Sequence, residues 1–163
     1  MTAIQQSGTI TPGHLCTWTT DGVIQDGGVL TPANTILARL LGADFNSIAD
    51  QAIQIPKLVT AFNISAILIT NASLSLTTAV GGFYPTTAKG GTAIVANSQV
   101  YSSLTAATKL LSATLAANAA ATRYSSANVD NISGYLTIYL SLTSAQAVAA
   151  TADVYIIGSN LSA

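Results

Sequence analysis

The stretch TPGHLCTWTTDGVIQDGG, residues 11–28, brings together side chain types that could bind a metal ion. His14 and Cys16 are two positions apart, so on a strand both side chains would point to the same side, and both residue types are zinc ligands. A tetrahedral site needs four ligands, however, and the chain has no other histidine or cysteine. Only Asp21 or Asp26 could complete the set, so we expect a packed or hydrogen-bonded histidine beside a buried thiol instead.

Nucleophilic and hydrolytic chemistry have no better support. Activation of Cys16 by His14 would require basic groups or a helix N-terminus nearby to lower the thiol pKa, and the stretch offers neither. A carboxylate pair would need two acidic residues in one place, whereas every acidic residue here is an aspartate in or beside turn-like sequence. These aspartates are Asp21, Asp26, Asp44, Asp50, Asp130 and Asp153. We therefore expect no catalytic residue and no enzyme.

Two glycine pairs, at 81–82 and 90–91, flank FYPTTAK and raise the possibility of a phosphate-binding loop. The run KGGT lacks the order GK[ST] of a P-loop and no strong helix follows it, so we interpret the segment as a surface loop with glycine hinges. Phe83 and Tyr84 would then anchor this loop or contact a neighbouring subunit. We expect no cofactor and no metal.

The charge content restricts the possible partners. Only 7% of the residues are charged, against about 25% in an average soluble protein. The net charge is -1 and the basic residues form no cluster, which argues against nucleic acid as a partner. No run of about 18 apolar residues could cross a bilayer, the first residues lack a signal-peptide pattern, and the single cysteine agrees with synthesis in a reducing cytoplasm. So few charges on an apolar chain predict a surface that is partly buried against partners.

Residues 1–50 are rich in turn signals and are predicted to form an extended N-terminal arm. Within the arm, HLCTWTT, the pair Asp21-Gly22 and VIQ have the pattern of a small hairpin with a type I′ turn. Thr31 can cap a short helix that starts at Pro32 and stops at Gly42. The apolar face of this helix would consist of Ile36, Leu37, Leu40 and Leu41.

Residues 51–163 are predicted to form a small antiparallel β-sandwich of the jelly-roll kind, because short alternating segments recur between connections rich in Gly, Asn and Ser. The clearest strands are AFNISAILIT, YLTIYLSL and DVYIIGS, and further ones are ASLSLTTAV, TAIVAN and ATKLLSATL. The alanine-rich segments 98–122 and 143–152 have helical propensity, and the second is expected to be a loop.

The alternation within two of these strands predicts which side chains share a face. In AFNISAILIT the residues on one face are Phe62, Ile64, Ala66 and Leu68, and those on the other are Ser65, Ile67 and Ile69, so we expect both faces to be at least partly covered. In YLTIYLSL the inward residues are Leu136, Ile138, Leu140 and Leu142, and the outward residues are Tyr135, Thr137, Tyr139 and Ser141.

The opening SGTITPGHLCTWTTDGVIQDGG resembles the N-terminal segment of a group of tailed-bacteriophage virion proteins, in which an SG, a TPGH, a tryptophan and a GV followed by QDGG recur. The runs VGGFYPTTAKGGTAIVANSQVYSSLTAATK and YLTIYLSLTSAQAVAATADVYIIGS are similar to phage structural proteins built on a small β-sandwich. The resemblance covers most of the chain and involves no catalytic motif. It implies a virion protein that is made in the host cytoplasm and needs no cofactor.

The resemblance further implies a capsid decoration, or cement, protein on the outer capsid surface. The arm would bind the major capsid protein across subunit seams, and the sandwiches would associate as a homotrimer. Contacts of the arm would come from Pro12, His14, Trp18, Asp21 and Gly22. Trp18, the only tryptophan, would anchor the interface or pack under its own sandwich.

Two other functions stay open. A tail- or fibre-associated protein involved in host attachment would use the same arm to dock on the virion, with the sandwich carrying specificity for host glycans. A virion-associated hydrolase is the least supported, because the chain contains no glutamate and one histidine.

Overall fold

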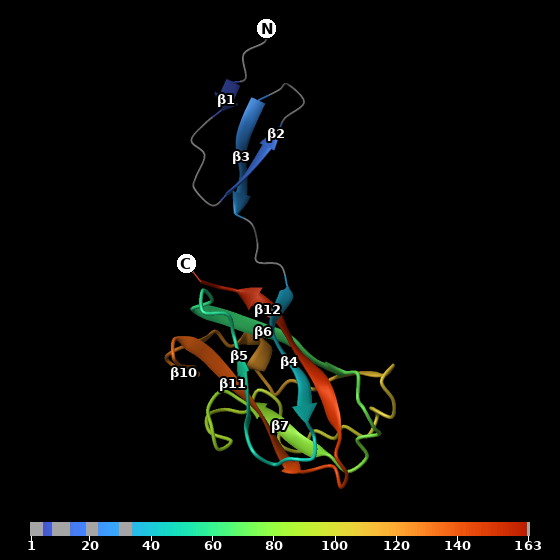
Figure 1. Ribbon diagram of the computed structural model, residues 1–163. Coiled ribbons are helices and arrows are strands. Elements are labelled where there is room, and N and C mark those ends of the chain that lie inside the picture. Colours follow the sequence, from blue (N-terminus) through green and yellow to red (C-terminus); the bar gives the residue numbers. More distant parts are fainter. Residues whose placement is uncertain (1–4, 8–13, 19–22, 30–33, 163) are drawn as a thin grey trace. The chain divides into compact units, whose positions relative to one another are not determined.

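The computed structural model describes residues 5–7, 14–18, 23–29 and 34–162, and up to residue 29 it describes the backbone alone (Figure 1). The chain divides into two compact units, Met1–Ala33 and Asn34–Ala163, which are described separately. Within the described part of the chain, no helix has the length and the apolar character needed to cross a membrane.

The first unit contains three strands, β1 (Gln5–Ser7), β2 (His14–Trp18) and β3 (Val23–Val29). β3 lies between the other two strands, parallel to β1 and antiparallel to β2. Trp18 is opposite Ile24 in the β2–β3 pair, so the two predicted hairpin strands are confirmed. The predicted turn at Asp21-Gly22 lies outside the described residues.

The second unit is a sandwich of two antiparallel sheets. In the first sheet, β12 lies between β4 and β6, and β6 also pairs with the short strands β8 and β9. In the second sheet, β11 pairs with β5, β7 and β10. The strands are β4 (Thr35–Asp44), β5 (Gln51–Gln54), β6 (Ala61–Thr70), β7 (Val80–Tyr84), β8 (Leu110–Ser112), β9 (Tyr124–Ser125), β10 (Asp130–Ile132), β11 (Tyr135–Ser144) and β12 (Thr151–Asn160). The predicted mainly-β antiparallel sandwich is confirmed.

One hydrophobic core joins the two sheets. Ile67 of β6 and Ile156 of β12 belong to it from the first sheet, and Ile138 and Leu140 of β11 belong to it from the second. These side chains have no exposed surface. Burial of apolar surface on this scale is the main favourable contribution to folding.

The prediction of a helix from Pro32 to Gly42 is wrong, because β4 occupies this segment and pairs with β12. The helix-like spacing has a structural cause. Ala38 is opposite Ile156 and Ile36 is opposite Ile157, so Leu37 is an extra residue that forms a β-bulge. Leu37 and Ala38 are consequently both buried, which breaks the alternation typical of a strand.

The predicted boundary between arm and sandwich, after residue 50, is corrected by the same strand. β4 belongs to the first sheet of the sandwich, and the compact unit that contains it starts at Asn34. Residues 34–50 are therefore part of the sandwich.

The prediction that Phe62, Ile64, Ala66 and Leu68 share a face of β6 is correct for the first two residues and wrong for the last two. The buried residues of the strand include Phe62 and Ile64 together with Ile67 and Ile69, whereas Ala66 and Leu68 are half-buried. β12 pairs Gly158 with Ile64 and Ile157 with Ala66, which leaves Ser65 as an extra residue. This bulge reverses the alternation in the rest of the strand.

In β11 the four inward residues are buried as predicted, but Thr137, Tyr139 and Ser141 on the opposite face are buried too.

Gly81 and Gly82 also differ from the prediction, since they lie inside β7 and are buried rather than serving as hinges of a surface loop. β7 pairs Gly82 with Ser141 and Tyr84 with Tyr139. Successive residues are buried in both strands, so both faces of the second sheet are covered along this pair.

Three further predicted strands are wrong or shorter than expected. ASLSLTTAV forms no strand before Val80, TAIVAN contributes isolated bridges at Val95, and ATKLLSATL contains only β8. The alanine-rich segment 98–122 contains one short 3₁₀ turn, η1 (Ala119–Ala121). The segment between β11 and β12 is a loop, as expected.

Candidate functional site

The structure places His14, Cys16 and Trp18 in β2 but does not describe their side chains, and Pro12, Asp21 and Gly22 lie outside the described residues. The contacts predicted for the arm therefore stay predictions. Among the described residues, no three His, Cys, Asp or Glu side chains lie close enough to hold a metal ion.

Phe83 and Tyr84, predicted to contact a neighbouring subunit or to anchor their own segment, lie inside the sandwich. Phe83 has no exposed surface and Tyr84 is 5% exposed. The Phe83 backbone N–H donates to the carbonyl of Val95 over 3.1 Å. A side chain without exposed surface is not available to a second subunit, and Phe83 is part of the core of its own sandwich.

The first candidate for a binding surface is the side of the first sheet that faces away from the core. Strand pairing places Ile36 and Ala66 on either side of Ile157, and Arg39 and Leu68 on either side of Tyr155. We call this set the outer face: Ile36, Arg39, Ala66, Leu68, Tyr155 and Ile157. Ile36 is 60% exposed, Arg39 is exposed and the other four side chains are half-buried. The outer face is thus an accessible, mostly apolar surface at the middle of a sheet.

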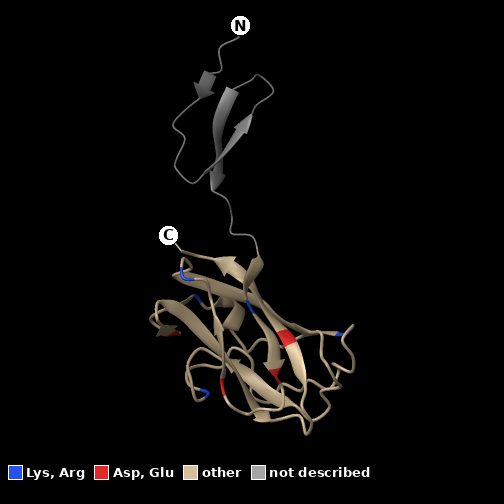
Figure 2. Ribbon diagram, viewed as in Figure 1, with Lys and Arg blue, Asp and Glu red and all other residues tan. Residues whose placement is uncertain are grey.

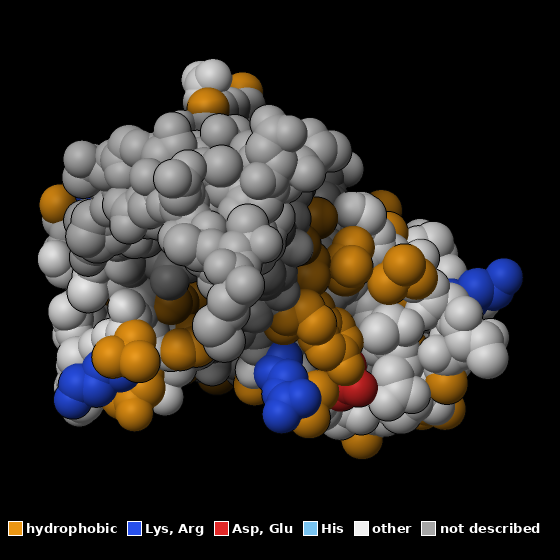
Figure 3. Space-filling view, turned by 90° about the horizontal axis from the view of Figure 1, so that it is seen from above, with side chains coloured by type: hydrophobic (Ala, Val, Ile, Leu, Met, Phe, Trp, Pro, Cys, Tyr) orange, Lys and Arg blue, Asp and Glu red, His pale blue; other side chains and the backbone are white. Residues whose placement is uncertain are grey.

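Charges of both signs lie on or beside the outer face. Arg39 lies on it, and Asp153, next to it on β12, is half-buried and accepts hydrogen bonds from the Gly42 N–H over 2.8 Å and from Asn71 Nδ2 over 3.0 Å. Charged residues are widely spaced over the sandwich (Figure 2). On the part of the sandwich that the grey residues leave visible in Figure 3, hydrophobic side chains lie among other side chains, with basic side chains at separate positions.

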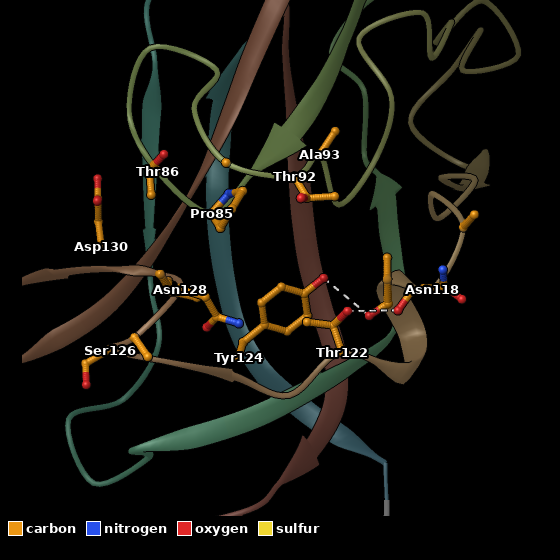
Figure 4. Close-up of a pocket in the computed structure, with 15 residues that line it drawn as sticks. Pro85, Thr86, Thr92, Ala93, Asn118, Thr122, Tyr124, Ser126, Asn128 and Asp130 are labelled. Atoms are coloured by element: carbon orange, nitrogen blue, oxygen red, sulfur yellow. Dashed lines mark hydrogen bonds between the residues drawn. The ribbon is translucent and has the colours of Figure 1, made fainter.

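The second candidate is a pocket of about 630 Å³ on the sandwich (Figure 4). Its walls come from two parts of the chain, the segment that follows β7 and the segment from 117 to 130, which includes η1 and β9. The residues that line it are Pro85, Thr86, Gly91, Thr92, Ala93, Ala117, Asn118, Ala119, Thr122, Tyr124, Ser126, Ala127, Asn128, Val129 and Asp130. We refer to it as the loop pocket.

Hydrogen bonds and one ring contact hold the walls of the loop pocket in place. The Tyr124 ring stacks on Phe62, with centroids 5.4 Å apart, and its hydroxyl donates to the carbonyl of Ala119 over 3.3 Å. Thr122 Oγ1 donates to the carbonyl of Asn118 over 2.9 Å (Figure 4). The Asn128 side chain accepts the N–H of Ser125 over 2.8 Å. The pocket is therefore preformed.

Several polar side chains of the loop pocket are free to bind a ligand. Thr86, Thr92, Asn118 and Ser126 make no side-chain hydrogen bond within the part of the chain that the structure describes. Asp130, whose Oδ2 accepts the Thr87 N–H over 3.1 Å, is the one charged residue of the lining. The pocket thus offers hydroxyl and amide groups, one carboxylate and no cation.

A buried tyrosine, Tyr139, makes the stability of the sandwich depend on pH in the alkaline range. Tyr139 is 3% exposed, and its hydroxyl makes no hydrogen bond of good geometry within the described part of the chain, although the Asp130 carboxylate lies near it. Burial, and then the carboxylates of Asp130 and Asp50, raise its pKa from 10.0 to about 12. Its pKa is higher in the folded than in the unfolded chain, so the stability it contributes is complete below pH 10 and is lost as the pH rises through 12.

We therefore expect the free energy of unfolding to fall more steeply with pH in the wild type than in Tyr139→Phe between pH 10 and 12. The difference in slope should be about 1.4 kcal/mol per pH unit at most. Urea unfolding at a series of pH values measures both slopes. Parallel pH profiles would show that Tyr139 is already ionised or exposed in the folded state.

Neither candidate surface was identified from the sequence. The outer face depends on the two bulges, which shift the register of β4 and β6, and the loop pocket joins segments about 30 residues apart. No protein-family model, curated protein or solved structure matches the chain.

Proposed function

We propose that this chain is a structural protein of a tailed-bacteriophage virion, a capsid decoration protein that binds the outer head surface and stabilises the capsid as an oligomer. The observation that carries the proposal is the outer face: an apolar surface on a compact sandwich that has few charges to keep it apart from other copies. The resemblance of residues 7–28 to virion proteins supports it, and so does the fact that these residues belong to a compact unit other than the sandwich.

Each of the two units would have its own role, one in capsid binding and the other in self-association. The first unit, 1–33, would bind the major capsid protein, and the sandwich would associate with other sandwiches. Neither task requires a cofactor. Many copies that each bury a modest area across subunit seams would resist the outward pressure of packaged DNA.

Self-association through the outer face agrees with the charges on and beside it. Because Arg39 and Asp153 lie on the same side of the sheet, the outer face of one copy can place its Arg39 against Asp153 of the next. Such pairing suits either a twofold interface or a closed ring, and we propose the homotrimer.

Replacing Ile36 with aspartate should therefore weaken self-association at least tenfold without unfolding the sandwich. Ile36 is 60% exposed, and burying it in an interface would contribute on the order of 1.5 kcal/mol, which is about a factor of ten in the dissociation constant. Sedimentation equilibrium across a range of concentrations measures this constant.

Leu58→Asp is the matched control, because Leu58 is 89% exposed and lies off the outer face, between β5 and β6. It should leave the association unchanged. If the wild type is a monomer at every concentration, or if both variants weaken association equally, self-association through the outer face is wrong.

The location on the particle is tested by immuno-gold electron microscopy with an epitope tag after Ala163. Gold spread over the head is the expected result, and capsids that lack the protein should then break down at a lower temperature. Survival of those capsids at the same temperature and low salt would contradict the stabilising role.

Gold at the tail alone would instead favour the alternative, a tail- or fibre-associated protein involved in host attachment. The observation that favours this second function is the loop pocket, a preformed cavity with free hydrogen-bonding groups.

A further inference from the structure

We propose that the loop pocket binds a neutral saccharide, about one or two sugar rings of a larger glycan. This function goes beyond capsid binding and does not depend on where the protein lies on the virion. Four properties of the pocket support it: volume, hydrogen-bonding groups, charge and apolar wall.

The volume suits a small ligand. Pockets that bind small molecules measure roughly 300 to 1,000 Å³, and the loop pocket measures about 630 Å³. Its walls are held by the hydrogen bonds of Thr122, Tyr124 and Asn128 within the same segment of chain. Binding would therefore require little ordering of the protein.

The free polar groups are those that recognise sugar hydroxyls. Thr86, Thr92 and Ser126 each offer a hydroxyl that can donate and accept, and Asn118 offers an amide with both functions. Sugar hydroxyls likewise donate and accept. Asn118 has a left-handed backbone conformation, with φ 66°, at the start of η1.

The charge of the pocket excludes acidic ligands. No lysine, arginine or histidine lines it, and Asp130 places a carboxylate at one side. Phosphate, sulfate and the carboxylate of acidic sugars would lose their hydration without gaining a cationic partner. A ligand with hydroxyl groups alone can donate to Asp130, so the preference for neutral sugars follows from the lining.

The wall between these polar groups is built from small aliphatic side chains. Ala93 and Ala127 offer the accessible part of it, against which the C–H faces of a sugar ring can pack, while Pro85 and Val129 are buried behind them. The Tyr124 ring is 4% exposed and stacks on Phe62, so no broad aromatic face is available to the ligand. We therefore expect weak binding, with a Kd on the order of 1 mM or about −4 kcal/mol. An oligomer or a virion would reach useful avidity through many copies.

The test uses the full chain labelled with ¹⁵N and a panel of free sugars. The neutral probes are glucose, galactose, mannose, N-acetylglucosamine and lactose, and the acidic probes are glucuronate, N-acetylneuraminate and glucose 6-phosphate, none of which carries a second, neutral ring. At up to about 20 mM, well above a millimolar Kd, at least one neutral sugar should shift amide signals of 91–93 and 117–130 in a saturable way. The acidic probes should shift none of them.

Two variants assign the effect to the loop pocket. Ala127 is exposed on the lining, so Ala127→Trp should fill the cavity and weaken binding at least tenfold. Ala149→Trp, an exposed alanine of the β11–β12 loop away from the lining, is the matched control and should bind like the wild type.

The proposal is overturned if no neutral sugar shifts these signals, if acidic probes shift them equally, or if Ala127→Trp binds as well as Ala149→Trp. None of these outcomes depends on particle binding or oligomer formation, so the capsid proposal can fail while this one holds, and the reverse.

Discussion

Replacing Gly158 with alanine is expected to destabilise the sandwich by about 3 kcal/mol. A Cβ at this position would lie 1.9 Å from the backbone oxygen of Asn63 and 2.8 Å from Leu37 Cδ1. Asn63 cannot move aside easily, because it lies within β6 and its side chain accepts the N–H of Ser159 over 2.9 Å. Urea unfolding with an unchanged m-value measures the loss.

Gly42 provides the control that separates crowding from backbone conformation. Its φ is +65°, but no atom lies within 4 Å of the Cβ that alanine would add. Gly42→Ala should therefore cost only about 1 kcal/mol, the cost of a left-handed conformation for a residue with a side chain. Gly42→Asn should cost less, since asparagine tolerates this conformation better. A loss for Gly158→Ala no larger than for Gly42→Ala would contradict the close approach of β12 to β6.

The second large effect is that two tyrosine-to-phenylalanine changes should alter the free energy of unfolding in opposite directions. Tyr101 has no exposed surface, packs edge-to-face on Phe45 with centroids 5.0 Å apart, and donates its hydroxyl to the carbonyl of Gly81 over 3.1 Å. Tyr101→Phe removes this buried hydrogen bond and should cost about 1 to 2 kcal/mol. Thermal or urea unfolding at pH 7 checks the value.

Tyr139→Phe removes a hydroxyl that is buried without a hydrogen bond of good geometry, so at the same pH it should stabilise the sandwich by about 1 kcal/mol. Ser141→Ala removes the other such hydroxyl and should act in the same direction. Equal destabilisation by Tyr139→Phe and Tyr101→Phe would show that the Tyr139 hydroxyl is bonded in solution.

The elements that the sequence predicted best are those in which local pattern and tertiary pairing agree. β6 has the bounds of AFNISAILIT, and the predicted YLTIYLSL and DVYIIGS lie within β11 and β12. These segments combine β-branched residues with alternation, so their strand structure is favoured both locally and in the sheet.

The errors arise where a neighbouring strand determines the structure. The spacing of Ile36, Leu37, Leu40 and Leu41 fits a helix as well as it fits a strand with a bulge at Leu37, and only pairing with β12 distinguishes the two. The reversal of faces after Ser65 likewise depends on which residue Gly158 opposes. Both bulges lie opposite residues 156–158 of β12. Gly158, which has no side chain, allows Leu37 of β4 and Asn63 of β6 to approach closely there.

The candidate sites could not be predicted from the sequence for the same reason, because they depend on which segments the fold brings together. The loop pocket is assembled from 85–93 and 117–130, and neither segment has a motif that indicates a partner. Phe83 and Tyr84 look like surface aromatics beside two glycines, yet Gly81 and Gly82 lie in a buried strand. The lack of a side chain permits close contact of Gly81 with Leu142 and of Gly82 with Val95.

The central position of β12 has a consequence for the synthesis of the protein. β4 and β6 are synthesised before β12 and do not pair with each other. Both pair with β12, at residues 151–160, which is synthesised last of the three. During translation both strands expose unsatisfied edges, and the first sheet can close only after residue 160 has left the ribosome. Pairs so distant in sequence fold slowly. The nascent chain should therefore need chaperone protection until β12 has emerged, and destabilising changes in β12 should lower the soluble yield more than equal changes in β7.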